Sequence, residues 1–259
     1  MPAADLDGPL ADFMERTKQA REIVAVVEAA SRNPSVLSTP RAGIDLSQIG
    51  IRTGNTANSM ALIFLASSFE EFIREEATQC ANYLMDKYAG LPDSNRHAIR
   101  DAYWFISRER LKFMKSVLVK NVPDPSYIAQ VASVLDALRG FVVNDDASKL
   151  ASTIFGQHSN NFRPDVVTEI FKRLCIKQVV PLLGESSKLK TYFGVTKKDE
   201  CAAKLSAKWN EFYDRRNETV HSLGGSTGYA VEVIFGYIEL FELTAEALKA
   251  ILAKTLATW

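Results

Sequence analysis

Three side chains suited to chemistry on a phosphate lie close together near the C-terminal end of this 259-residue sequence. They are a guanidinium at Arg216, an amide at Asn217 and an imidazole at His221. A guanidinium fork holds two anionic oxygens and keeps its charge, and an imidazole exchanges protons near neutral pH. The spacing predicts a compact polar site that binds an anionic group and moves a proton.

The direction of each side chain follows from helical periodicity, because residues three and four apart share one face of an α-helix. Arg216 falls in a row that is otherwise apolar, so we expect it to point inward. Asn217 shares the neighbouring row with Tyr213 and His221, which places the amide and the imidazole on one face beside Arg216. The apolar members of the Arg216 row are Leu205, Trp209, Phe212, Val220 and Leu223.

A structural interpretation accounts for the same segment without chemistry. Arg215 falls on the opposite side of the helix, where pairing with Glu211 would make it an ordinary solvated charge. The stem of Arg216 could lie on apolar surface with its head in water, and a histidine near a helix C-terminus interacts favourably with the helix dipole. The context of the motif decides between the two interpretations.

Arg216-Asn217-x-x-x-His221 resembles the R-N-x-x-x-H signature of the HEPN superfamily of helical ribonucleases, in which the motif closes the penultimate long helix. Residues 61–76, ALIFLASSFEEFIREE, are similar to the second helix of the RiboL-PSP and MAE-type branches, with Glu70 on the acidic position. Residues 161–176, which end in FKRLCI, are similar to the short helix and "rlgi" turn of these branches. Ser222 departs from the pattern, since many relatives have glycine there, and this should affect the helix ending more than the reaction.

The resemblance implies a metal-independent endoribonuclease that uses no cofactor. The 2′-OH of RNA would attack the neighbouring phosphate and leave a 2′,3′-cyclic phosphate and a 5′-hydroxyl. Arg216 and His221 would be the catalytic residues, one binding the phosphate and the other transferring a proton. Asn217 would orient the ring or the phosphate, Glu70 would hold Arg216 or His221 in position from the neighbouring helix, and Tyr213 would add a hydroxyl to the same face.

The resemblance also implies partners, because the family forms dimers in which two motif helices face each other across a composite active site. We therefore expect RNA as substrate, a two-fold homodimer, and a toxin or antiphage-defence effector with an antitoxin or defence-system partner. The alternative is a non-catalytic helical interaction or nucleotide-binding module. Solvent-accessible Arg216 and His221 that lie close together in a dimer cleft would favour catalysis, and burial of His221 against apolar neighbours would favour that module.

Composition is consistent with an intracellular protein. The chain has 31 Lys and Arg residues and 31 Asp and Glu residues, so it carries no net positive charge that would attract nucleic acid. Any contact with nucleic acid must therefore be local. Three separated cysteines fit a reducing cytoplasm, and the three histidines show no zinc-ligand spacing. We expect neither a signal peptide nor a membrane-spanning segment, since residues 1–30 contain no apolar block.

Periodicity predicts an all-α fold, and the resemblance implies a HEPN-like helical bundle with additional helices between the second long helix and the motif helix. We expect one domain over residues 1–259, within which residues 90–155 are the segment that an inserted subdomain would occupy. Basic and aromatic residues alternate near residues 94–117, which fits either RNA contact or a solvated helix with core-facing rings. The expected helices, apart from the motif helix, are 10–31, 57–88, 94–117, 125–140, shorter helices within 163–184, and 229–256.

Overall fold

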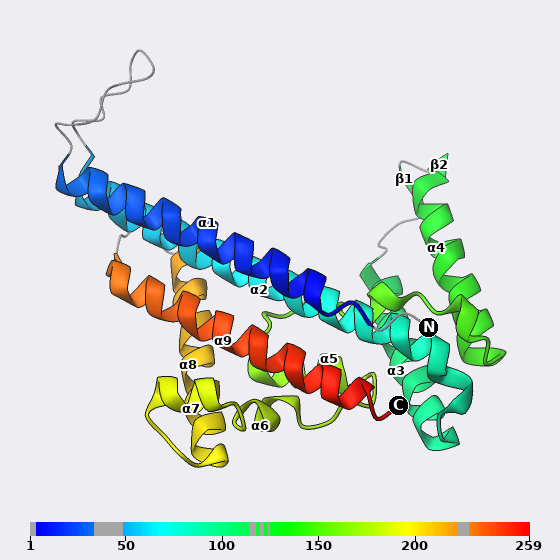
Figure 1. The fold of residues 1–259 in the computed structure, drawn as a ribbon. Helices are drawn as coiled ribbons and strands as arrows, with labels where there is room; N and C mark the ends of the chain where they lie inside the picture. The colour runs from blue at the N-terminus through cyan, green and yellow to red at the C-terminus, as the bar shows by residue number, and fades with distance from the viewer. Residues whose placement is uncertain (1–3, 34–48, 114–117, 120–121, 124, 222–227) are drawn as a thin grey trace. The chain divides into compact units, whose positions relative to one another are not determined.

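The structure is a computed structural model, and it describes residues 4–33, 49–113, 118–119, 122–123, 125–221 and 228–259 (Figure 1). These residues are almost entirely helical, so the predicted all-α class is confirmed. Within them, extended structure is confined to the short antiparallel pair β1 (Leu118–Val119) and β2 (Val122–Pro123).

The chain divides into two compact units by its internal contacts. One unit comprises Met1–Leu6, Ile73–Val179 and Ala250–Trp259, and the other comprises Asp7–Phe72 and Val180–Lys249. We call them the first and the second unit. The segment 90–155 belongs wholly to the first unit, whereas the motif residues 215–221 belong to the second. The expectation of a single domain with an insertion stays a prediction.

The second unit is organised around Phe69 of α2. The ring centroid of Phe69 lies 5.8 Å from Phe13 of α1, 5.2 Å from Trp209 of α8 and 4.5 Å from Phe241 of α9. Such ring pairs each contribute about 0.5–1.5 kcal/mol beyond simple burial. This packing fixes the motif helix between its neighbours. This unit contains α1 (Asp7–Arg32), α6 (Val179–Leu183), α7 (Ser187–Phe193) and α8 (Lys198–His221), together with α2 (Ile51–Lys87) up to Phe72 and α9 (Val231–Leu256) up to Lys249.

The start of α8 is set by the turn before it. A Cβ on Gly184 would overlap the carbonyl oxygen of Lys198, so only glycine permits this approach of the two backbones. Between them, Ser186 caps α7 by accepting a hydrogen bond from the backbone N–H of Leu189. The α7 helix then ends at Gly194, whose φ of 63° is left-handed.

The first unit has its own aromatic core, with Tyr103 of α3 against Phe141 at 5.0 Å and Phe155 at 5.8 Å. Tyr88 also packs on Phe141, at 5.4 Å. Its helices are α3 (Asp93–Phe113), α4 (Pro125–Ala137), α5 (Pro164–Lys172), the 3₁₀ turns η3 (Tyr88–Gly90), η5 (Ala147–Lys149) and η6 (Ser152–Ile154), and the π-helical turn η4 (Leu138–Val143).

Most predicted helices are present, with different ends. The second long helix begins at Ile51 rather than near residue 57. Asn58, next to the expected start, donates to the backbone of Tyr229 at 2.7 Å, a long-range contact that periodicity cannot reveal. The segment 163–184 is broken because Cys175 and Gln178 adopt positive φ values of 61° and 58°. The expected ends near residues 117 and 224–225 lie outside the described residues.

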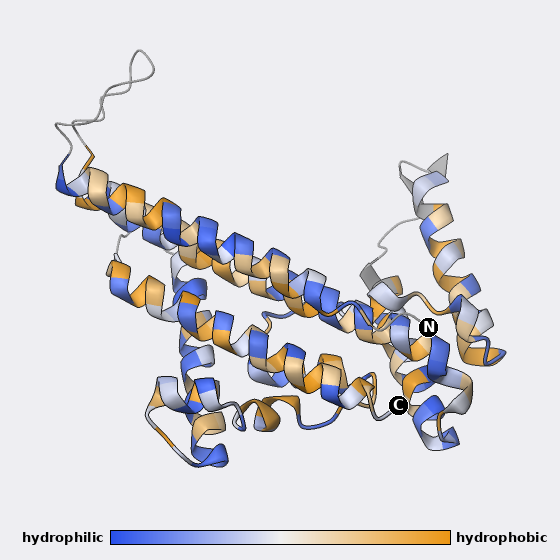
Figure 2. Cartoon of the chain, in the orientation of Figure 1, coloured by the Kyte–Doolittle hydropathy of each residue, from blue (hydrophilic) through white to orange (hydrophobic). Residues whose placement is uncertain are grey.

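Hydrophobic and hydrophilic residues are interleaved along α1, α2 and α9 (Figure 2). Each helix therefore has apolar positions for packing without being apolar throughout. In the part of the chain that the structure describes, no helix has a stretch both long and apolar enough to cross a membrane.

Candidate functional site

The motif lies in the last two turns of α8, which has the acidic residues Asp199 and Glu200 in its first turn and ends at His221. Acidic residues in a first turn stabilise the positive end of the helix dipole. Leu205, Trp209 and Phe212 are all completely buried, as the apolar row predicted. Val220 of the same row is half-buried, and Leu223 lies outside the described residues.

Arg216 is half-buried, and its Nε has almost no accessible surface. One hydrogen bond joins it to the motif itself, from Nη1 to Oδ1 of Asn217 at 3.3 Å. Nε finds no acceptor among the described residues. The stem therefore follows the apolar row inward, while the end of the guanidinium lies at the amide of Asn217.

His221 is exposed at the last residue of α8, and Asn217 one turn earlier is half-buried. Tyr213, in the same row, is fully buried with its hydroxyl, and its ring lies 5.2 Å from that of Phe212. The row thus runs from the core to solvent along the helix. The Tyr213 hydroxyl therefore does not lie on an open face as expected, and a supporting role for Tyr213 stays a prediction.

Glu70 lies on α2, one residue after Phe69, whose ring packs on Trp209 of α8. It is half-buried, and its Oε1 has almost no accessible surface. The two helices are therefore direct neighbours at this level. The expected role of Glu70 in holding Arg216 or His221 stays a prediction.

Arg215 belongs to a cluster that the sequence did not predict in full. The expected pair with Glu211 is confirmed, with Nη2 and Oε1 at 2.8 Å. The expectation of an ordinary solvated charge is wrong, because the guanidinium carbon also lies 5.3 Å from the ring of Tyr229 and 6.0 Å from that of Tyr237. These residues, with Lys208, are called the Arg215 cluster below. Lys208 donates to Glu211 at 2.9 Å and lies 5.0 Å from the Tyr237 ring.

Electrostatics within the Arg215 cluster favour the ionised carboxylate. Burial alone would raise the pKa of Glu211, but hydrogen bonds from Lys208 and Tyr237 and the charges of Lys208 and Arg215 outweigh it and lower that pKa. Burial and the hydrogen bond to Glu211 raise the pKa of the Tyr237 hydroxyl. Tyr237 therefore remains a proton donor to Glu211 throughout the neutral range.

Tyr229 also anchors the chain that follows the motif. Its hydroxyl donates to the carbonyl oxygen of Arg215 at 3.3 Å, and its own carbonyl accepts from Asn58 Nδ2 of α2 at 2.7 Å. Sequence reasoning missed Asn58, Tyr229 and Tyr237 because they come from separate elements with no regular spacing. Periodicity detects only partners within one helix, such as Glu211.

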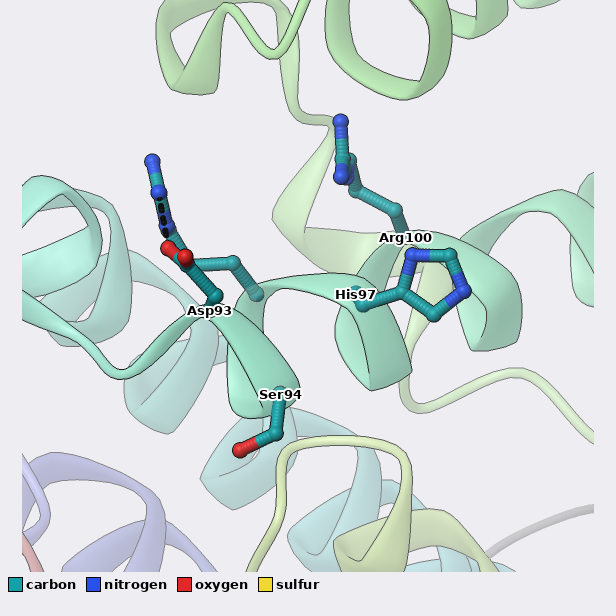
Figure 3. Close-up of a pocket in the computed structure, with 5 residues that line it drawn as sticks. Asp93, Ser94, His97 and Arg100 are labelled. Carbon is teal, nitrogen blue, oxygen red and sulfur yellow. Dashed lines mark hydrogen bonds and ion pairs between the residues drawn. The ribbon is translucent and has the colours of Figure 1, made fainter.

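A second polar cluster, in the first unit, lines a cavity of about 630 Å³ beside the start of α3 (Figure 3). Its side chains diverge, with Ser94 and Arg100 pointing in opposite directions. Arg96 pairs with Asp93, and its Nη1 lies 3.1 Å from Asp145. Arg100 Nη1 lies 3.4 Å from the same carboxylate. These guanidiniums hold the turn at Asp145 against α3, so the cluster is structural.

Within the described residues, no group of three or more His, Cys, Asp or Glu side chains is placed to hold a metal ion. Comparisons with protein-family models, with curated proteins and with solved structures found no match to this chain.

Proposed function

We propose that this protein is a metal-independent endoribonuclease of the HEPN type, with Arg216 and His221 as its catalytic residues. The observation that supports this most directly is the exposure of His221 at the end of α8, one turn beyond the contact between Arg216 and Asn217. An exposed imidazole can reach a substrate. The alternative, a non-catalytic helical or nucleotide-binding module, was expected to bury His221.

The proposed reaction needs no external nucleophile, because RNA supplies its own. The 2′-oxygen bonds to phosphorus as it loses its proton, and the P–O5′ bond breaks as the 5′-oxygen gains one. The products are a 2′,3′-cyclic phosphate and a 5′-hydroxyl. A guanidinium stabilises the charge that gathers on the non-bridging oxygens, and hydrogen bonds to charged groups are about twice as strong as neutral ones. Arg216 has this role through the end of its guanidinium, since its Nε is buried.

His221 supplies one proton-transfer group per chain, whereas the reaction uses both a base and an acid. A two-fold dimer would bring a second His221 to the same cleft, because an isologous interface places identical residues of both subunits near the axis. The proposal therefore includes a homodimer with a composite site. Its biological setting would be that of a toxin or antiphage-defence effector, with an antitoxin or defence-system partner.

The test is to incubate the purified protein with mixed RNAs in EDTA and to analyse the ends of the products. We expect cleavage that leaves 2′,3′-cyclic phosphates and that is lost in His221→Ala. Activity that disappears in EDTA and returns with magnesium or manganese would contradict the mechanism. Intact RNA at every protein concentration would favour the non-catalytic module.

A further inference from the structure

The first unit contains a cavity of about 630 Å³ between α3 and the segment that leads into α5. We call it the α3–α5 cavity. This volume lies within the range of about 300–1,000 Å³ that small-molecule sites occupy. Its lining combines aromatic, amide and carboxylate groups, among them Phe105, Glu109, Gln157, Asn160 and Glu169.

One wall of the α3–α5 cavity is held rigidly by Arg173. This side chain is only 10% exposed and donates to the backbone oxygens of Phe155 at 3.0 Å and Gln157 at 2.6 Å. It also donates to Oε1 of Glu169 at 2.8 Å. Burial would raise the pKa of Glu169, but Arg173 and the neighbouring His158 outweigh it and hold that pKa below its ordinary value. The wall is therefore preformed and carries an ionised carboxylate.

His158 in the same wall is 12% exposed, and both of its ring nitrogens are engaged. Nδ1 accepts from the backbone N–H of Asn160 at 3.0 Å, and Nε2 lies 3.5 Å from Oε2 of Glu169. Both contacts hold the ring in place, so His158 orders the turn at residues 158–160.

The opposite wall presents an aromatic ring. Phe105 is 52% exposed, although large apolar side chains are usually buried. The guanidinium of Arg108 lies 4.8 Å from the ring centroid and also pairs with Glu109 at 3.1 Å. A ring has two faces, so a cation over one face is compatible with a flat ligand on the other. From the sequence alone, the aromatic rings of this helix fit either RNA contact or packing in the core. Tyr103 is buried, whereas Trp104 and Phe105 are exposed.

We propose that the α3–α5 cavity binds a guanine base stacked on Phe105 and held by Glu109. Guanine is the base whose N1–H and N2–H donors point the same way, so they match the two oxygens of one carboxylate as an Arg fork does. A carboxylate offers roughly four acceptor positions, which makes its ion pair with Arg108 compatible with this contact. The amides of Gln157 and Asn160 can serve the acceptors O6 and N7. Arg108 is 50% exposed and would bind a phosphate group next to the guanine base.

The guanine could belong to a free nucleotide or to an unpaired residue of RNA, and both present the same edge. Titration calorimetry with GMP, AMP, CMP and UMP tests the first source. Nonamers of uridine with and without one central guanosine test the second. Using His221→Ala protein keeps the RNA intact and separates this inference from the proposed cleavage. We expect GMP, or the guanosine-containing nonamer, to bind at least about tenfold tighter than its adenine or uridine counterpart.

Two substitutions with matched controls locate the binding. Phe105→Leu should weaken guanine binding by about tenfold through lost stacking, whereas Trp104→Leu, an equally exposed ring on the same helix, should not. Glu109→Gln should turn the preference from guanine toward adenine, since an amide matches the donor and acceptor of that base. Asp101→Asn is its control. Equal binding of all bases, no binding of either probe, or equal losses in Trp104→Leu would overturn the proposal. Phe105→Leu could lose binding because it is less stable, which a lower Tm would reveal. Glu109→Gln keeps the size of the side chain, so its base preference still tests the proposal in that case.

Discussion

Tyr237 of α9 donates its hydroxyl to Oε1 of Glu211 at 3.0 Å, the same oxygen that receives Nε and Nη2 of Arg215. Tyr237 is 1% exposed, so this carboxylate joins a buried residue of one helix to the turn that precedes Arg216 in another. The contact makes the Arg215 cluster the support on which the motif is placed.

Removing the Tyr237 hydroxyl should destabilise the protein through Glu211. Tyr237→Phe is expected to lower the free energy of unfolding by about 1.5–3 kcal/mol, the usual net value of a hydrogen bond to a charged group. In urea denaturation, the effects of Tyr237→Phe and Glu211→Gln should not add. The control is Tyr192→Phe, whose hydroxyl donates to the backbone of Gly236 at 3.0 Å and whose effect should add to that of Glu211→Gln. Additive effects of Tyr237→Phe and Glu211→Gln would show that this hydrogen bond does not contribute to stability.

The stability of the protein should depend on pH through the ionisation of Glu211. Its folded pKa lies below the ordinary value of 4.5, so its ion pairs stabilise the protein above that pH and are lost as pH falls through the folded pKa. The stability difference between the wild type and Glu211→Gln should therefore be largest above about pH 5 and should shrink below it. Urea melts from pH 3 to 7 would measure this, and a constant difference would contradict it.

The catalytic assignment predicts a loss of cleavage without a loss of fold. Arg216→Ala and His221→Ala should each lower the cleavage rate by at least about a hundredfold, with unchanged circular dichroism. Glu218→Gln, an exposed charge in the same turn, is the control and should cleave normally. Arg215→Ala should lower stability, because Glu211 loses a partner, and should affect cleavage less than Arg216→Ala. Undiminished cleavage by His221→Ala would remove that residue from the mechanism.

The sequence predicted what depends on local periodicity and missed what depends on tertiary contact. The buried row at Leu205, Trp209 and Phe212 and the Glu211–Arg215 pair both follow from helical spacing, and both are present. The aromatic partners of Arg215 could not be predicted in this way. Tyr237 lies 26 positions from Glu211, and its approach depends on how α9 packs on α8.

Backbone conformation was a second limit to prediction. Cys175 occupies the glycine position of the "rlgi" turn that the resemblance identified, and its φ of 61° lies in the left-handed region that favours glycine. Cysteine in RLCI gives no sign of this, since its side chain does not encode a positive φ. The family assignment itself remains a proposal.

The turn at Cys175 can be tested by two small replacements. Cys175→Gly relieves left-handed strain but adds chain entropy to the unfolded state, so stability should change little. Cys175→Val is similar in size to cysteine, yet a β-branched residue tolerates positive φ poorly. We expect the valine variant to be less stable than the glycine variant by about 1–2 kcal/mol in urea denaturation. Equal stabilities would indicate that the turn relaxes to another conformation.

Assembly provides the last prediction, because each chain brings one motif histidine, His221, to a reaction that uses two proton-transfer groups. In a composite cleft, a heterodimer of wild-type and His221→Ala chains should retain only part of the activity, since acid and base each contribute on the order of a hundredfold. Dilution to a concentration at which light scattering shows a monomer should nearly abolish cleavage. Heterodimers of wild-type and Glu218→Gln chains control for the mixing. A strictly monomeric protein with full activity would refute the shared site, even if Arg216 and His221 proved essential.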